Sequence, residues 1–424
     1  MLRFSLLLLF VLVGVPHARA ADVDDPEVLA NLAVERQPGL DALAAQTDAM
    51  RAVATTARLW MDPMLGAELS NLPITTPILG AHAMSGLQFK LQQTFPAPGE
   101  IRSRTATAEA RVLASERDWD AAANALRGEV RARYQDLAVL RQLEAVTRAH
   151  LADLDRLIGA VDARYRVGSA DQHDLLQLAL RRDRLGEFLA DFSAKQEMVL
   201  ASINGALARD PATPITTPEL SALVPLPQDA AARQEALGSH PDLERLRSMA
   251  AVARAEAEQA RFEANPEPTV WLGYRVRTEV PNGDPGTNFV TAGVSVPLPF
   301  ASTKKYRALA QAAEARARAA DESVASRQAR LLSMLAAAEA QYARAAQRAG
   351  TYRTLLEPAA RAALDSTSSA YQVDRAAFAD LVRAEVDLLD VQRARLLAES
   401  EAASARADIL TLLGPSAAPD GDDR

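Results

Sequence analysis

Histidines, methionines and carboxylates are the side chains with which this sequence could bind a metal or catalyse a reaction. No two histidines beyond residue 20 have the i, i+4 spacing that places two metal ligands on one face of a helix. They are scattered, at His82, His150, His173 and His240. A methionine group near His82 could offer soft ligands to Cu(I), although such groups are more often ordinary packing. Its members are Met61, Met64 and Met84.

The remaining reactive side chains form no catalytic constellation. Pairs such as Asp153/Asp155 and Glu399/Glu401 do not present convergent carboxylates, and Ser169 has no base at a readable spacing. There is no phosphate-binding glycine loop. The chain has no cysteine, which excludes disulfides, Cys-ligated zinc and iron–sulfur clusters. We therefore predict a protein that is not an enzyme and that carries no cofactor and no resident metal.

The composition favours long helices packed through small side chains. Of the 424 residues 49% are hydrophobic but only 5% are aromatic, and Ala, Leu and Arg dominate. The formal net charge of −8 argues against a nucleic-acid partner, which needs an excess of Lys and Arg to displace phosphate counterions.

The N-terminus has the pattern of a secretory signal. Arg3 precedes an apolar run over residues 4–15, and Ala18-Arg19-Ala20 suits signal peptidase, so residues 1–20 are predicted to be a signal peptide. The alternative, an N-terminal membrane anchor, would need about 20 apolar residues, and this run has about twelve. No later stretch is apolar enough to cross a membrane as a helix.

The rest of the chain contains an internal repeat. Gln37-Pro38-Gly39-Leu40 is echoed about 200 residues later by His240-Pro241-Asp242-Leu243, and Phe95-Pro96-Ala97-Pro98 by Val296-Pro297-Leu298-Pro299. A proline-rich segment that cannot be helical separates the copies. The predicted units are repeat 1 over residues 21–207, a linker over 208–228, repeat 2 over 229–414 and a disordered tail over 415–424.

Each copy changes pattern twice. A helical segment of about 35 residues runs to Trp60 in the first copy and to Ala264 in the second, and a proline follows each. Alternating apolar and polar residues then predict two strands per copy. These strands are expected around Gly66 to Leu72, Leu87 to Gln92, Val270 to Arg277 and Val290 to Val296.

The second strand of each copy is followed by a very long helix. Helices are predicted over Glu100 to Arg166 and Ser302 to Ala370, each followed by a break and a helix of about 38 residues. The long helix measures roughly 100 Å at 1.5 Å per residue. Leu151, Leu154 and Ile158 belong to a seam with alternating steps of three and four residues, which is typical of a coiled coil.

Four strands with one apolar face cannot close a barrel. An open edge in lipid leaves unpaired backbone groups that cost several kcal/mol each, so other subunits must complete the sheet. The predicted fold is mainly α with a membrane β-barrel. Two structural repeats trimerise into a 12-stranded barrel above an α-helical periplasmic tunnel. Polar strand residues would line the water-filled lumen of the barrel, namely Gln88, Lys90, Gln92, Arg275 and Arg277.

These motifs resemble the TolC family of outer-membrane efflux proteins over nearly the whole mature chain. The resemblance rests on the twofold repeat, on Phe95-Pro96-Ala97-Pro98-Gly99, and on Tyr165-x-Val167-Gly168 leading to Asp174-Leu175-Leu176. The run from Gln93 to Gly99 is most similar to the heavy-metal branch, the CzcC-type components of cation efflux systems.

The resemblance implies a homotrimeric exit duct in outer-membrane lipid that extends into the periplasm. It would dock on a periplasmic adaptor (membrane fusion) protein and an inner-membrane resistance-nodulation-division pump, and conduct substrate passively. Heavy-metal cations are the favoured cargo and organic compounds the alternative. A periplasmic coiled-coil scaffold or adaptor is a further alternative, which has no use for membrane-length amphipathic strands.

The resemblance also implies where the adaptor docks and where the duct closes. The turns between helices, carrying Val167, Gly168, Ser169 and Val373, would meet the adaptor. Asp380 resembles a carboxylate that rings the constriction, and Asp174 and Tyr371 resemble positions that link helices in the closed state. The family's arginine and second carboxylate are replaced by Ala376 and Arg383, and its second-turn glycine by Asp374. We therefore expect a replacement charge network of Asp380 with Arg383, or of Asp374 with Arg375.

Overall fold

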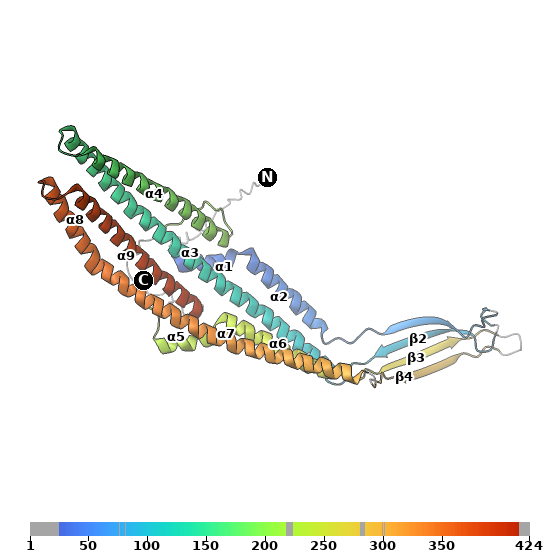
Figure 1. Cartoon of the computed structure of the whole chain (residues 1–424). Helices are drawn as coiled ribbons and strands as arrows, with labels where there is room; N and C mark the ends of the chain where they lie inside the picture. The colour runs from blue at the N-terminus through green and yellow to red at the C-terminus, as the bar shows by residue number, and fades with distance from the viewer. Residues whose placement is uncertain are drawn as a thin grey trace, which may run out of the picture.

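The computed structural model has a helical body at one end and a small sheet at the other (Figure 1). It describes residues 25–75, 77–80, 82–217, 224–279, 285–298, 300 and 302–414. The predicted signal peptide, the predicted tail and the turn before Pro285 lie outside the described residues. Within these residues, no helix combines the length and the apolar character needed to cross a membrane.

The first predicted helical segment is broken at a proline. Instead of one helix there are two, α1 (Pro26–Arg36) and α2 (Pro38–Thr56). Pro38 holds the preceding Gln37 in an extended conformation with ψ of 112°, because its ring clashes with a helical residue before it. The second half breaks in the same way at His240, between a short helical stretch and α6. That stretch comprises α5 (Ala230–Ala236) and the 3-10 turn Leu237–Ser239, and α6 is Pro241–Phe262.

All four predicted strands are present, including the strand after Pro63. They are β1 (Met64–Ser70), β2 (Gly86–Thr94), β3 (Thr269–Val276) and β4 (Phe289–Ser295), antiparallel in the order β1-β2-β3-β4. The register pairs Leu91 with Leu272 and Phe89 with Tyr274, so the apolar residues of neighbouring strands share one face. Leu65, Leu272 and Val290 on this face are more than half exposed.

Polar and aromatic residues cover the opposite face of the sheet. Arg275 donates to Gln88 Oε1 at 2.7 Å, and the Lys90 ammonium lies 5.0 Å from the centre of the Trp271 ring. Trp271 in turn lies over Gly293, where a Cβ would meet the indole at 2.5 Å. The predicted division of the strands into an apolar and a polar face is therefore present.

The first long helix agrees with the sequence prediction. α3 (Glu100–Arg166) has 67 residues and is followed by α4 (Gln172–Ala206). The predicted seam is present, because Leu154 and Val161 are buried with Leu185 of α4 in one apolar cluster. Gln196, which interrupts the seam on α4, donates to Glu144 Oε2 of α3 at 2.7 Å.

The second long helix departs from regular α geometry in its middle. It consists of α7 (Thr303–Thr351), a π-helical turn (Tyr352–Leu356) and α8 (Glu357–Gln372), and it precedes α9 (Phe378–Leu413). Pro358 explains the change, because a proline inside a helix cannot donate to the carbonyl four residues earlier and its ring clashes with that carbonyl. A π-turn before the proline lets the rod continue.

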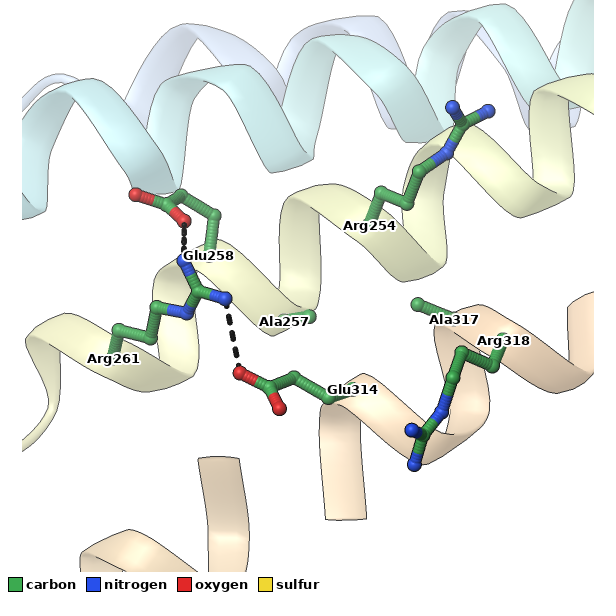
Figure 2. A pocket seen from close by; sticks show the side chains of 7 residues that line it. All are labelled: Arg254, Ala257, Glu258, Arg261, Glu314, Ala317 and Arg318. Carbon is green, nitrogen blue, oxygen red and sulfur yellow. Dashed lines mark hydrogen bonds and ion pairs between the residues drawn. The ribbon is translucent and has the colours of Figure 1, made fainter. Parts of the chain in front are cut away.

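Alanine explains how α6 and α7 pack with almost no aromatic residues. Ala257 and Ala260 of α6 and Ala313 and Ala317 of α7 are buried in one cluster, and small side chains allow the helix backbones a close approach. Figure 2 shows Ala257 and Ala317 facing the same gap. At its rim Arg261 reaches Glu258 at 3.1 Å and Glu314 at 2.9 Å.

Substitution of Gly99, the last residue of the Phe95 to Gly99 motif, should lower the stability of the fold. Gly99 starts α3 with φ of +88°, and a Cβ there would meet the Phe262 ring at 2.5 Å. We expect Gly99→Ala to destabilise the fold by about 1–2 kcal/mol from the left-handed backbone alone. Thermal unfolding in detergent, followed by helical circular dichroism, measures this change.

Gly159→Ala is the matched control in the same helix. No atom lies within 4 Å of a Cβ at Gly159, so this variant should be unchanged or stabilised by up to about 1 kcal/mol. Equal melting temperatures for the two variants would contradict the explanation of the motif.

Candidate functional site

The Met/His group near the first hairpin is not brought together by the fold. Met64 pairs with Gln92 at one end of the hairpin, whereas Met84 lies just before Gly86, which pairs with Ser70 at the other end. Six residues of strand separate these ends by about 20 Å. The imidazole of His82 accepts the backbone N–H of Met84 at 3.2 Å. The Cu(I) site considered from the sequence therefore has no support. Throughout the described chain, no three His, Asp or Glu side chains gather as metal ligands.

The predicted docking and gate residues gather at the end of the helical body opposite the sheet. Two turns lie there, one between α3 and α4 and one between α8 and α9 (Figure 1). Val167 and Val373 at their apices are 78% and 61% exposed. Gly168 has φ of +78°, and Ser169 closes its turn by donating its backbone N–H to the Arg164 carbonyl at 2.9 Å.

Asp374 reproduces the conformation of Gly168 in the second turn. Its φ is +59°, and the following Arg375 donates its backbone N–H to the Ala370 carbonyl at 2.8 Å. Asp is among the residues that tolerate the left-handed region, because its short polar side chain can bond locally. The second turn therefore has the same backbone form as the first, with Asp374 in place of a glycine such as Gly168.

Arg164, which the sequence analysis missed, joins the two turns. Its guanidinium on α3 forms an ion pair with the Asp374 carboxylate, donates to the Tyr371 carbonyl at 3.2 Å and lies 4.8 Å from the centre of the Tyr371 ring. In the sequence it is one arginine among many on a polar helix face. Its role depends on the position of a turn about 200 residues away.

The predicted charge pairs are not formed within the described chain. Asp374 pairs with Arg164 rather than with Arg375, and no ion pair joins Asp380 to Arg383 among the described residues. Asp380, Arg383 and Asp387 instead line a groove between α8 and α9 together with Leu356, Ala360, Ala363, Ala384 and Val391. Both Asp380 and Arg383 are exposed to solvent.

The charge of Asp174 acts on Tyr371 across the tip. Burial, and then the neighbouring Asp171 carboxylate, raise the pKa of Asp174. Burial also raises the pKa of Tyr371, where Arg164 opposes the shift and Asp174 adds to it. Tyr371 packs against Phe378 of α9 with ring centres 6.2 Å apart, so the tip combines an apolar contact with a charged one.

The family model for outer membrane efflux proteins matches residues 29–182 and 232–415. The chain belongs to this family. The protein is accordingly located in the outer membrane and extends into the periplasm. No curated protein sequence matches the chain significantly.

Solved structures share the fold at low sequence identity. The outer-membrane channel OprN is 20% identical with a TM-score of 0.78, over 93% of this chain and 91% of OprN. VceC from Vibrio cholerae is 20% identical with a TM-score of 0.76, over 92% of this chain and 96% of VceC. CusC, whose structures concern folding and transmembrane channel formation, is 16% identical with a TM-score of 0.76, over 92% of each chain.

The geometry predicts that Arg164 holds the two tip turns together. Arg164→Ala removes the ion pair with Asp374, the bond to the Tyr371 carbonyl and the contact with the Tyr371 ring. We expect amide hydrogen exchange over residues 371–378 to become about twofold faster or more. Mass spectrometry of the peptides from this turn measures the rate.

Arg166→Ala is the matched control, because Arg166 pairs with Asp162 on its own helix. That variant should leave exchange in the second turn unchanged. If both variants behave alike, Arg164 does not link the turns.

Proposed function

We propose that three copies of the chain form a closed outer-membrane duct that passively conducts substrate from the periplasm to the outside. The main evidence for this proposal is the four-stranded sheet. Its apolar face is exposed, and β1 and β4 each have one neighbouring strand within the described chain. Edges of this kind in lipid leave unpaired backbone groups at several kcal/mol each. Pairing β4 of one copy with β1 of the next removes the edges and turns the polar face inward.

The helices support a tube beneath this barrel. In both halves a helical segment precedes two strands, a long helical rod and a shorter returning helix. This order supports the proposal of two repeats, over residues 21–207 and 229–414, joined by the linker 208–228. α3 spans about 100 Å at 1.5 Å per residue, so three copies side by side are long enough to reach deep into the periplasm. A periplasmic scaffold would explain these helices but not the exposed apolar sheet.

The tip turns are the proposed adaptor-docking surface. Val167 and Val373 are apolar, exposed and at the apices, and Gly168 and Ser169 complete the first turn. Small apolar residues on rigid hairpin turns suit a protein partner, here a periplasmic adaptor that links the duct to an inner-membrane pump of the resistance-nodulation-division type.

The proposed gate lies in the same region. Arg164 with Asp374 and Tyr371 holds the two hairpins of one chain together. Asp174 lies in the first turn of α4, and Arg375 lies in the turn before α9. Asp380 and Arg383 are exposed and lack a partner of opposite charge within the described chain, which leaves them available to a neighbouring copy or to the lumen. Carboxylates repeated around a threefold axis repel one another and attract cations.

Heavy-metal cations are the proposed cargo, on the resemblance of the Gln93 to Gly99 run to the cation-efflux branch. We expect a strain lacking this protein to become sensitive to divalent cations such as cobalt, zinc, cadmium or nickel, or to copper or silver, and to recover with the intact gene. Minimum inhibitory concentrations across these metals and a panel of organic compounds measure this. Sensitivity confined to the organic compounds would favour the alternative, a duct for drugs.

The duct proposal predicts a protein that fractionates with the outer membrane, needs detergent and has the mass of three chains. In planar bilayers the trimer should conduct ions with a preference for cations. Asp380→Ala should reduce that preference, because it removes one carboxylate per copy from the proposed constriction.

Asp191→Ala serves as a control, because Asp191 pairs with Lys195 on α4, far along the helix from the tip. A detergent-free monomer in the periplasmic fraction would refute the duct. Unchanged selectivity in Asp380→Ala would remove Asp380 from the constriction while leaving the duct in place.

A further inference from the structure

A buried polar layer crosses the helical bundle between two apolar layers, away from the tip. His150 on α3 is 4% exposed, and both of its ring nitrogens face α9. Nδ1 lies 2.7 Å from Glu385 Oε1, and Nε2 lies 2.8 Å from Gln392 Oε1. Leu154 and Leu389 belong to the apolar layer on one side, and Leu143 and Leu396 to the layer on the other.

The hydrogen bond between Gln392 and Glu357 fixes the orientation of the Gln392 amide. Gln392 donates its Nε2 to Glu357 Oε1 at 3.1 Å, so its carbonyl oxygen points at His150. Glu357 is the first residue of α8, directly after the π-turn, and its other oxygen lies 2.8 Å from Arg395 Nε. Three elements therefore meet at this layer, α3 through His150, α9 through Glu385 and Gln392, and α8 through Glu357.

This arrangement requires a doubly protonated imidazole. Both ring nitrogens face acceptor oxygens, and only the imidazolium has two N–H donors. A neutral His150 would leave a lone pair facing either Glu385 or Gln392. Turning the Gln392 amide over would satisfy His150 but would point the amide oxygen at the Glu357 carboxylate. Deprotonation therefore breaks at least one buried hydrogen bond, whichever tautomer forms.

Charged groups from every packed element act on the layer. Asp153 on α3 and Glu385 on α9 favour the imidazolium, Arg181 on α4 faces Glu385, and Glu357 on α8 is balanced by Arg395. Burial by itself lowers the pKa of His150. The hydrogen bonds with Glu385 and Gln392, together with the carboxylate charges, outweigh burial, so the pKa lies above its ordinary value of 6.5.

We infer that His150 is a proton-operated latch between the α3/α4 hairpin and the α8/α9 hairpin. In its charged form it holds α3 against α9, and in its neutral form it releases them. Any sliding or separation of the hairpins at this level must break both imidazole contacts. The consequence for conduction rests on the proposed function, because separating the hairpins widens a duct only if three chains enclose one.

The direction of the pH dependence follows from the raised pKa. A group whose folded-state pKa exceeds its unfolded value stabilises the fold fully below the unfolded pKa, near 6.5, and loses that contribution as pH rises through the folded value. The latch is therefore closed at acidic pH and weakened at alkaline pH. The loss of one buried hydrogen bond corresponds to an increase of about fivefold in the population of the opened state.

The test uses the full-length protein in detergent and measures the latch without conduction. Hydrogen exchange at the imidazole C2 position, followed by mass spectrometry, gives the pKa of individual histidines. His150 should titrate above its ordinary value of 6.5, and Glu385→Gln should lower its midpoint. Amide exchange in α9 around residues 383–395, corrected for intrinsic base catalysis, should accelerate about fivefold above that midpoint.

His150→Gln should remove this pH dependence, and His173→Gln should retain it. A His150 midpoint at or below 6.5 would overturn the latch, as would pH-independent α9 exchange in the wild type. Planar-bilayer recordings from pH 5.5 to 8.5 separate the two proposals. If the exchange results hold but the protein conducts at no pH, the duct fails and the latch stands. If it conducts but α9 exchange has the same pH response in wild type and His150→Gln, the latch fails and the duct stands.

Discussion

The pairing of β2 with β3 is the interaction on which the rest of the structure depends. These strands come from opposite halves of the chain, and their register from Leu87 with Val276 to Thr94 with Thr269 gathers the apolar residues on one face. The contact continues past the strands, where the Phe95 backbone N–H donates to the Pro268 carbonyl at 2.9 Å and Gly99 approaches the Phe262 ring. A slip of one residue would place the apolar residues of β3 on the polar face of β2.

Beyond the sheet, apolar layers join the helices, and polar contacts occur between them at a few positions along the helix axes. Alanine clusters and leucine seams supply most of the buried surface, but small repetitive side chains would pack almost equally well after a shift along the helix. Buried charged groups cost free energy unless they are paired, so they distinguish one register from its neighbours. His150 with Glu385 does this between α3 and α9, and Arg131 with Glu27 does so between α3 and α1, where Arg131 is 3% exposed.

Sequence patterns predicted the elements well and the contacts between them poorly. The strand alternation, the limits of α3 and the seam through Leu154 follow from local periodicity, which neighbouring residues impose on one another. The break at Gln37 and the π-turn Tyr352–Leu356 were missed although Pro38 and Pro358 stand in the sequence. The Met61 to Met84 group suggested a site because its members are close in sequence, but an extended hairpin places its two ends far apart.

The sequence by itself determined that the chain consists of long helices and amphipathic strands, and that short motifs recur about 200 residues apart. Composition, period and motif spacing are local properties, and they are sufficient for those conclusions. Only the tertiary structure decided that Arg164 bonds to Asp374 and that His150 faces two acceptors from α9. Each of these pairs joins residues about 200 or more positions apart, and the packing of one hairpin on another, rather than any local pattern, brings them within hydrogen-bonding distance.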